Sequence, residues 1–600
     1  MTNDHKLLKR SEVPEELTWD LTTIYADDQE FDRDLQAVKD AIPELAAYQG
    51  KVHQSSKDLL DYIEKSLEAE LLIETAYVYS HLKNDQDTGE DKYQVMNQKA
   101  LAVYTELEAA MAWFEPELLE IEDAHLEAFY VEQPELKVYK TYLDALRVQK
   151  GHVLDGAQEA LLAEAGDVLR GSGQTFALLN NADLKFGKIT TEDGQEVELT
   201  HGNYSTFIES SNPQVRKAAF ETIYKRYMEL KNTFASTLGN NIKVDNFNAK
   251  AHKYPSARNA AMSKNQIPEE VYDTLVGVVN ENLPLLHRYL ALQQKALGLE
   301  EMHMYDLHTP ITGKAPFNIT YEEAVQETFK ALAPLGEDYL AILQECFDNR
   351  WIDVLENEGK RSGGYSSGGY ATSPYILLNW QDDLSNFFTL VHELGHSVHS
   401  YLTRKNQPFV YGNYSIFLAE IASTTNENLL TEYLLNKYTD EESQKYILNS
   451  YLNRVKSTIF RQTQFAEFEH LMHTAAQEGT PLTQDFLAKT YAELNERYYK
   501  PVVQDPEIAY EWARIPHFYM NYYVYQYSTG MAAAIALSQK ILTEGKPALD
   551  AYLAYLSAGR SDKPIEIMKK AGVDMTKADY LNDSMKVFEA RLQQLEDLMK

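Results

Sequence analysis

Apolar and polar residues alternate along most of this 600-residue chain with the period of an α-helix. The first 180 or so residues form long amphipathic patterns that are rich in Glu, Leu, Ala and Tyr and contain few helix breakers. Gly (27) and Pro (19) are scarce overall, as expected where turns and strands are few. The pattern therefore predicts a mainly α-helical protein.

Two short stretches depart from the helical period. Residues 185–199 contain two β-prone runs joined across Glu192-Asp193-Gly194, which is typical of a β-hairpin, and residues 375–380 also resemble a strand. A chain of 600 residues exceeds what one hydrophobic core can hold, so two or more lobes are expected. We interpret the hairpin as the boundary between an N-terminal helical lobe (1–200) and a second domain (201–600).

A pronounced helical stripe begins after Asp382 and Asp383, which suit a helix N-terminus. Its apolar members predict a helix with one face in the core: Leu384, Phe387, Phe388, Val391, Leu394, Gly395, Val398 and Leu402. On the flank of this stripe lies His392-Glu393-Leu394-Gly395-His396. Residues i and i+4 lie one turn apart on the same helix face, so both imidazoles can reach a single cation with Glu393 beside them.

This motif is the arrangement of a catalytic zinc site, although a chain of this composition produces it by chance roughly once in twenty. The alternative is two core histidines satisfied by hydrogen bonds, and it fits poorly because both lie well off the centre of the apolar stripe. Gly395 costs the helix about 1 kcal/mol relative to Ala. That cost indicates the close approach of another backbone or of a substrate.

A catalytic zinc ion takes three protein ligands and leaves a fourth position for water. His399 lies seven residues after His392, roughly 10 Å along the helix axis, which is too far for both to bind one ion. Glu420 is the better third candidate, because it lies in a second helical pattern at residues 417–427. Glu427 is either an ordinary solvated glutamate or a group that orients a ligand histidine.

The sequence His392-Glu-Leu-Gly-His396-Ser-Val-His399, followed by Leu418-Ala-Glu420-Ile-Ala-Ser423, resembles the M3 family of zinc metallopeptidases, and within it bacterial oligoendopeptidase F. Residues 12–21 and 265–272 resemble the same subfamily, so the likeness extends over nearly the whole chain. The resemblance implies a large, two-lobed helical peptidase with a deep substrate channel, a few short strands near the active site and cleavage of short peptides. One Zn²⁺ per chain would be held by His392, His396 and Glu420.

Residues 515–527 hold a histidine and a dense run of tyrosines. In a chain with 41 tyrosines, aromatic packing is the ordinary explanation. A His followed by two Tyr three residues apart nevertheless resembles the family's oxyanion-binding motif, which implies that role for His517, Tyr522 and Tyr525. The gap between the His and the pair is longer in the thimet-type branch, so Tyr519 stays an alternative.

Upstream of the zinc helix, residues 362–370 contain four glycines. They indicate a mobile loop whose backbone can approach a ligand. A phosphate-binding loop is disfavoured because the Gly-x-x-x-x-Gly-Lys-Ser/Thr pattern is absent. In the resembling family such a loop and its adjoining strand contact peptide substrate, and a strand edge can hold an extended peptide through main-chain hydrogen bonds.

The composition of the chain indicates which partners and which cellular compartment to expect. The net charge of −35 disfavours nucleic acid, which usually needs a basic face. The single cysteine, Cys346, excludes an internal disulfide framework and suits a reducing compartment as a buried apolar side chain. The N-terminus lacks a hydrophobic signal core and no run of 18 apolar residues occurs, so we expect a cytoplasmic protein without membrane contact. The oligomeric state stays open.

Together these features predict a zinc endopeptidase for short oligopeptides, in which Glu393 takes a proton from the metal-bound water that attacks the scissile carbonyl. Internal cleavage follows from family analogy alone. Two other functions stay open. One is a helical zinc carboxypeptidase, which needs a cationic clamp for the terminal carboxylate, and the other is a non-catalytic peptide-binding protein.

Overall fold

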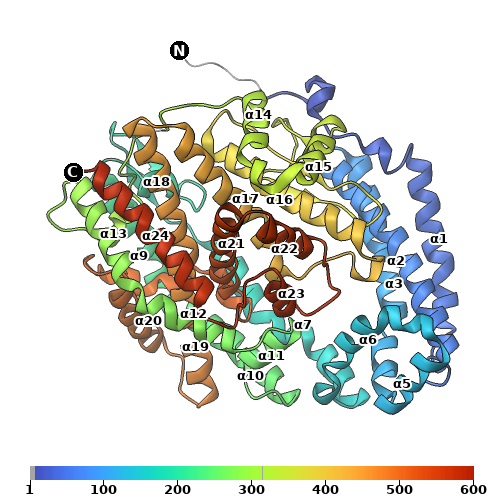
Figure 1. Ribbon diagram of the computed structural model, residues 1–600. Coiled ribbons are helices and arrows are strands. Elements are labelled where there is room, and N and C mark those ends of the chain that lie inside the picture. Colours follow the sequence, from blue (N-terminus) through green and yellow to red (C-terminus); the bar gives the residue numbers. More distant parts are fainter. Residues whose placement is uncertain (1–6, 314) are drawn as a thin grey trace. The chain divides into compact units, whose positions relative to one another are not determined.

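The computed structural model describes residues 7–313 and 315–600, and most of them lie in α-helices (Figure 1). The prediction of a mainly α-helical fold with a few short strands is confirmed. The first six residues, on which the expected lack of a signal core partly rests, lie outside the described residues.

The chain forms two compact units, each assembled from three separated stretches. Unit 1 comprises the described residues up to 150, together with 317–433 and 537–572. Unit 2 comprises the described residues of 151–316, together with 434–536 and 573–600. Residue 200, expected to mark a domain boundary, is not one of these unit boundaries. Helices α17 and α21 each begin in one unit and end in the other.

Unit 1 starts with three long helices that pack side by side, α1, α2 and α3 (Figure 1). Two of them begin where a side chain accepts hydrogen bonds from first-turn amides: Asp27 caps α1 and Ser55 caps α2. The helices of unit 1 are α1 (Asp28–Ala46), α2 (Ser56–Asp85), α3 (Asp91–Met111), α4 (Phe114–Glu120), α5 (Asp123–Glu132), α6 (Lys140–Arg147), α14 (Tyr321–Ala331), α15 (Gly336–Asp348), α16 (Leu384–Asn406), α17 (Ile416–Lys437), α22 (Lys546–Leu556) and α23 (Pro564–Lys570).

Unit 1 also contains a small sheet with the order β3-β5-β4. The middle strand β5 (Tyr375–Leu377) is fully buried, and it pairs in parallel with β3 (Ile352–Asp353). On its other side it pairs antiparallel with β4 (Tyr365–Ser367), so that β4 is an edge strand. The strand expected within residues 375–380 is confirmed, and the glycine-rich segment before it contributes β4.

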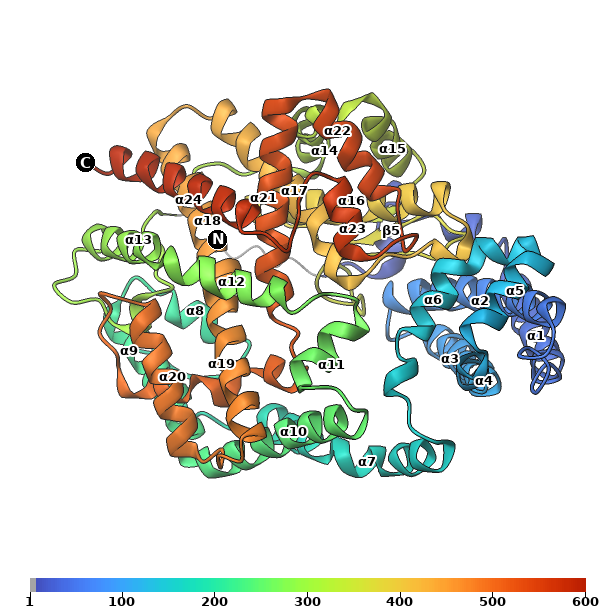
Figure 2. The same ribbon diagram turned by 60° about the horizontal axis from the view of Figure 1, so that its bottom comes forward.

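Unit 2 contains the predicted hairpin and a second set of helices, of which α19 and α20 lie side by side (Figure 2). Strand β1 (Lys188–Thr190) pairs antiparallel with β2 (Glu196–Glu198), and Gly194 in the connecting turn has φ +80°. The helices of unit 2 are α7 (Gly156–Leu178), α8 (Tyr204–Ile208), α9 (Pro213–Glu229), α10 (Lys231–Ala251), α11 (Ala257–Lys264), α12 (Glu270–Glu281), α13 (Leu283–Ala296), α18 (Glu441–Val455), α19 (Arg461–Gln477), α20 (Gln484–Tyr498), α21 (Tyr525–Glu544) and α24 (Asp579–Leu598).

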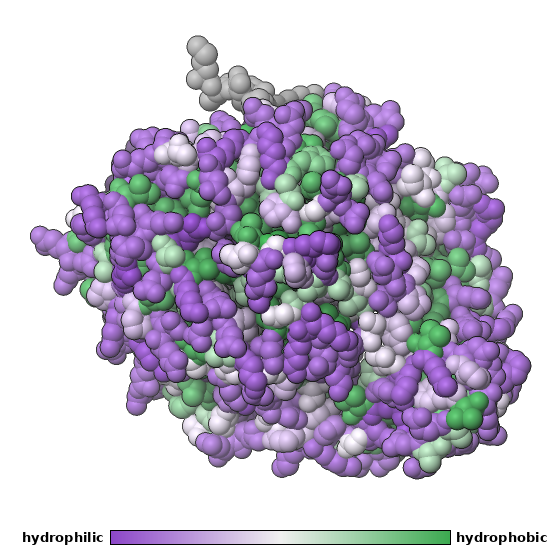
Figure 3. Space-filling view, in the orientation of Figure 1, coloured by the Kyte–Doolittle hydropathy of each residue, from purple (hydrophilic) through white to green (hydrophobic). Residues whose placement is uncertain are grey.

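The face drawn in Figure 3 is mostly hydrophilic, in keeping with the large net negative charge. Among the described residues no helix is long and apolar enough to cross a membrane. Cys346 is buried, as expected for a cysteine that serves as a small apolar side chain.

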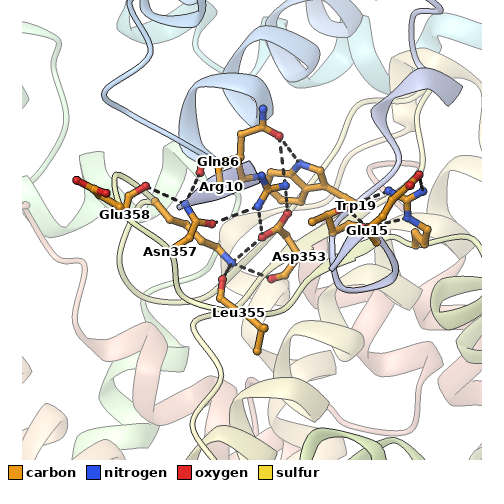
Figure 4. Close-up of polar contacts among 11 residues, drawn as sticks. Arg10, Glu15, Trp19, Gln86, Asp353, Leu355, Asn357 and Glu358 are labelled. Carbon is orange, nitrogen blue, oxygen red and sulfur yellow. Dashed lines mark hydrogen bonds and ion pairs between the residues drawn. The ribbon is translucent and has the colours of Figure 1, made fainter. Parts of the chain in front are cut away.

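A buried ion cluster ties the N-terminal segment to strand β3 (Figure 4). The carboxylate of Asp353, which is fully buried, lies 2.7 Å from the ammonium of Lys360 and accepts hydrogen bonds from Arg10 at 2.8 and 2.5 Å. Arg10 also reaches Asn357 and, at the end of α2, Gln86. Burial lowers the pKa of Lys360 despite the neighbouring carboxylate. Each buried cation in this cluster is therefore paired by one shared anion.

Removal of that anion should destabilise unit 1. Asp353→Asn leaves Lys360 buried without a charge partner, and we expect a loss of about 3 kcal/mol in the free energy of unfolding. Urea denaturation followed by circular dichroism measures the change. Asp348→Asn, on the exposed end of α15, is the matched control and should leave the midpoint within error. Equal midpoints for the two variants would contradict the proposed importance of the cluster.

Candidate metal centre

Helix α16 carries the His392–His396 motif and begins as predicted, with the carboxylate of Asp383 accepting a hydrogen bond from the backbone amide of Asn386 at 2.7 Å. The predicted apolar stripe is largely buried. Burial extends further around the helix than one stripe, however, because polar side chains of α16 are buried too: Glu393, Ser397, His399, Ser400 and Thr403. The helix therefore lies in the interior of unit 1, which a one-sided pattern does not predict.

Gly395 lies at the point where α16 and α17 approach most closely. A Cβ atom at this position would lie 2.5 Å from the Cα of Ser423 and 3.0 Å from the carbonyl oxygen of Ala422. No L-amino acid with a side chain fits at this distance without separation of the two backbones. The expectation that Gly395 admits another backbone is confirmed, and that backbone is α17.

Helix α17 is also held by α22. The hydroxyl of Tyr555 donates to the carbonyl of Leu418 at 2.8 Å, and the hydroxyl of Tyr552 donates to that of Ala422 at 3.4 Å. Both tyrosines are buried. The segment of α17 that faces Gly395 is thus fixed by contacts with two other helices.

This crossing brings Glu420 of α17 next to the two histidines of α16. The Nε2 atoms of His392 and His396 lie 3.2 Å apart, and Oε2 of Glu420 lies 3.4 Å from the first and 3.8 Å from the second. Donor atoms about 2.1 Å from a tetrahedral zinc ion lie about 3.4 Å from one another. The three side chains therefore have the spacing of a zinc site, and among the described residues no other group of three His, Cys, Asp or Glu side chains has comparable spacing.

Glu427, one turn beyond Ser423, orients one of these histidines. Its carboxylate lies 2.6 Å from Nδ1 of His392, which directs the lone pair of Nε2 towards the metal position. Burial alone would lower the pKa of His392, but Glu420 and Glu427 outweigh it and raise that pKa to about 10. A bound metal ion would therefore have to displace the proton of Nε2. Of the two interpretations of Glu427, the geometry supports the orienting one.

The pKa values of His396 and Glu393 shift in opposite directions. Burial and the neighbouring His392 lower the pKa of His396 to about 4, so its Nε2 is a free ligand atom. Burial raises the pKa of Glu393 to about 7, and a backbone hydrogen bond from Ser366 of strand β4 partly opposes that rise. A carboxyl group that titrates near neutral pH is suited to accept a proton and return it.

His399 has a packing role. It is 1% exposed, its ring stacks on Tyr414 with centroids 3.6 Å apart, and it also contacts the ring of Tyr555. Burial holds its pKa well below the usual range, so the imidazole is neutral. Its exclusion from the metal ligands on grounds of spacing agrees with the observed geometry.

The aromatic residues suggested for the oxyanion lie in unit 2, whereas the metal ligands lie in unit 1. The hydroxyl of Tyr522 is 3.1 Å from Nδ1 of His470. The backbone amide of Tyr522 donates to the carboxyl of Glu469 at 2.6 Å. Tyr522 has φ +56°, a conformation that non-glycine residues adopt only when their surroundings enforce it. No sequence pattern indicated His470 or Glu469, since both are 50 or more residues away from Tyr522 along the chain.

The other members of this segment have separate environments within unit 2. Tyr525 is 1% exposed at the start of α21, and the ring of His517 stacks on that of Tyr523. Tyr519 shares a hydrogen bond of 2.9 Å with Thr237. That contact favours a packing role for Tyr519. The oxyanion role of His517, Tyr522 and Tyr525 stays a prediction.

The fold and the site define a helical metallopeptidase, and comparison with known proteins agrees. Residues 206–587 match the model of peptidase family M3, and residues 117–186 match that of oligopeptidase F. Oligopeptidase PepF of Bacillus subtilis is 53% identical over 99% of this chain and 89% of its own length. Group B oligopeptidase PepB of Streptococcus agalactiae is 49% identical over 98% of both chains.

Solved structures give the same result. The crystal structure of oligoendopeptidase-F from Enterococcus faecium is 47% identical, with a TM-score of 0.75 over 95% of this chain and 99% of the other. A crystal structure from Chlamydophila abortus gives a TM-score of 0.94 at 35% identity, over 99% of this chain and all of the other. The chain belongs to peptidase family M3 and is a metalloendopeptidase.

Addition of one methyl group at Gly395 tests the close approach of α16 and α17. Gly395→Ala should push α16 and α17 apart, reduce zinc affinity and lower stability by about 1–3 kcal/mol, because the backbone of Ser423 cannot move aside freely. Gly277→Ala in α12 is the matched control, since its Cβ meets nothing within 4 Å and Ala favours a helix. Metal content and thermal unfolding of both variants would decide. Full zinc affinity in Gly395→Ala would refute the argument.

Proposed function

We propose that this protein is a zinc-dependent endopeptidase that hydrolyses internal bonds of short oligopeptides. The observation that supports it best is the His392–His396–Glu420 triad at tetrahedral spacing, with the buried carboxyl of Glu393 adjacent in sequence. Bound zinc would supply a Lewis acid and a water molecule whose pKa falls to about 7. One zinc ion per chain, bound by this triad, is sufficient for the reaction.

The protein's own groups then have distinct tasks. Glu393 takes the proton of the attacking water at its carboxylate and returns it to the nitrogen of the leaving amine. Glu427 keeps the ring of His392 in one orientation throughout. We assign the stabilisation of the tetrahedral oxyanion to Tyr522, Tyr525 and His517, a role supported by the family resemblance and by the enforced backbone conformation at Tyr522.

Strand β4 is the candidate platform for the peptide backbone. It is an edge strand of its sheet, and the backbone at Ser366 lowers the pKa of Glu393. The hydroxyl of Ser366 also shares a 2.8 Å hydrogen bond with Ser397 on α16, which links the strand to the helix that carries the motif. An extended peptide along this edge would bind mainly through its backbone, with little dependence on side chains.

Endopeptidase action is favoured over the carboxypeptidase and over a non-catalytic peptide-binding protein. The relatives from Streptococcus and Enterococcus are named an oligopeptidase and an oligoendopeptidase, and this chain retains the full set of ligands together with Glu393. We further propose that it acts in the cytoplasm on short peptides, without a nucleic-acid or membrane partner. The net charge of −35 disfavours a nucleic-acid partner, and the single buried cysteine supports a reducing compartment such as the cytoplasm.

A length series of end-blocked peptides that share one cleavable sequence tests the proposal. An endopeptidase cuts peptides without free termini, a carboxypeptidase does not, and a binding protein leaves them intact. We expect efficient cleavage of short peptides, little cleavage of folded proteins or unfolded whole chains, and complete loss of activity after chelation that zinc restores. Activity only on peptides with a free C-terminus would contradict the endopeptidase assignment. Cleavage efficiency that stays constant with length would contradict oligopeptide selectivity.

A pair of glutamate variants separates catalysis from metal binding. Glu393→Gln should reduce kcat by several orders of magnitude while zinc stays near one per chain, because Gln cannot accept the proton. Glu420→Ala should lose zinc as well, because a ligand is missing. Kinetics and metal analysis of the same preparations provide both measurements. Unchanged zinc affinity in Glu420→Ala would place the third ligand elsewhere.

Tyr522→Phe and Tyr525→Phe test the oxyanion role. For a donor used mainly in the transition state we expect kcat to fall roughly 10²- to 10³-fold with a smaller change in KM. Tyr519→Phe is the matched control and should be close to wild type, because its hydroxyl bonds to Thr237. Near-normal kinetics for both test variants would assign these tyrosines to packing.

A further inference from the structure

Unit 2 contains a cavity of about 960 Å³, and none of the residues assigned to the peptidase reaction is among those that line it. It is lined by the C-terminal half of α18, by the π-helical turn at Lys456–Phe460 that follows, and by the loop at residues 308–313. Half of its lining side chains carry an aliphatic hydroxyl, an amide or an imidazole group: Ser211, His308, Thr309, Thr312, Asn449, Ser450, Asn453 and Ser457. A cavity of this volume lies within the range of small-molecule binding sites.

Lys456 gives this cavity an unusual charge. The residue is 5% exposed, and its ammonium donates to the carbonyl of Leu307 at 2.8 Å and lies 5.7 Å from the ring of Tyr289. No described carboxylate forms an ion pair with it. Burial, reinforced by Arg461, lowers the pKa of Lys456 to about 7. Buried cations are normally paired, so a lysine without an anion on the wall of a polar cavity requires an explanation.

Two other cations of unit 2 show the usual arrangement. Arg216 lies 2.6 Å from the carboxylate of Asp306, and Arg461 lies 2.6 Å from that of Glu511. These two arginines contact a carboxylate, whereas Lys456 borders the cavity. The surroundings at the cavity wall are also positive, because Lys456 and Arg461 add to the effect of burial and lower the pKa of His308 to about 3. His308 is therefore a neutral hydrogen-bonding group.

Thr309 provides an independent observation. It is 4% exposed, and its hydroxyl has no hydrogen-bond partner among the described residues. A buried hydroxyl without a partner costs about 1–3 kcal/mol. Glu209, the one carboxylate among the described lining residues, is exposed, so it does not neutralise the buried lysine. Lys456 and Thr309 thus offer a cation and an unused hydroxyl to the same cavity.

We propose that this cavity binds a small organic anion, with a carboxylate or phosphate group against Lys456 and Thr309. The polar remainder of the ligand would lie along the amides and hydroxyls of α18, namely Asn449, Ser450 and Asn453. The volume favours a molecule larger than a bare ion such as chloride or phosphate, and the hydroxyl and amide walls favour a polar rather than an aliphatic body.

Equilibrium binding of inorganic phosphate and of succinate to the zinc-loaded protein tests the proposal and distinguishes the two anionic groups. We expect saturable binding of at least one probe to the wild type and at least tenfold weaker binding to Lys456→Met, which keeps the length of the side chain without its charge. Lys489→Met, at an exposed lysine of α20, is the matched control and should bind as the wild type does. Thr309→Val should weaken binding while Lys456 is intact.

Chemical labelling of the unaltered chain gives a second measurement, which does not depend on whether the variants fold. A short pulse of acetic anhydride, followed by peptide mass spectrometry, should acetylate Lys456 from the cavity. A saturating probe anion should reduce that labelling and leave Lys489 unchanged. Equal affinity of Lys456→Met and wild type would place the anion elsewhere, including at the metal centre. Absence of saturable binding of both probes, or labelling that the probes do not affect, would overturn the proposal.

Discussion

The metal centre depends on one constraint, the close approach of α16 and α17 at Gly395. Because the backbone of Ser423 lies where any Cβ would be, the two helices are near enough for side chains one turn to either side of the crossing to meet. Glu420, before Ser423, reaches both histidines, and Glu427, after it, reaches the far nitrogen of His392. Glu420, a candidate ligand, and Glu427, which orients the ligand His392, thus lie on one face of α17. The contact at Gly395 determines where that face lies relative to α16.

Sequence periodicity predicted the features that depend on local order. Helix α16 with its Asp383 cap, the hairpin at residues 188–198, strand β5 and the close approach at Gly395 all follow from patterns within about 20 residues. Sequence periodicity did not predict the burial of polar side chains of α16, nor the assembly of each unit from three separated stretches. Both depend on segments that meet only after folding. For the same reason the sequence left the role of Glu427 open, and it did not predict that Tyr522 contacts α19.

Buried cations are normally paired with a carboxylate, and several in this protein follow that rule. Arg10 is neutralised by Asp353, and Arg216 by Asp306, in each case by a residue far away along the chain. These pairs join segments that no regular secondary structure connects, so they contribute to specificity as well as to stability. Lys456 departs from the rule, and it does so at a π-helical turn, a local widening of the helix that is frequent at functional sites.

The late position of α22 in the sequence has a consequence for biosynthesis. The two tyrosines that hold α17 in place are residues 552 and 555, more than 100 residues after Glu420 and close to the C-terminal end of the chain. Domains generally begin to fold while the chain is still being made. Here the unit that carries the metal ligands lacks the stretch 537–572 while the preceding 536 residues are being made. The contacts that hold α17 in place therefore form only after Tyr552 and Tyr555 have been synthesised, more than 100 residues later than the ligand Glu420.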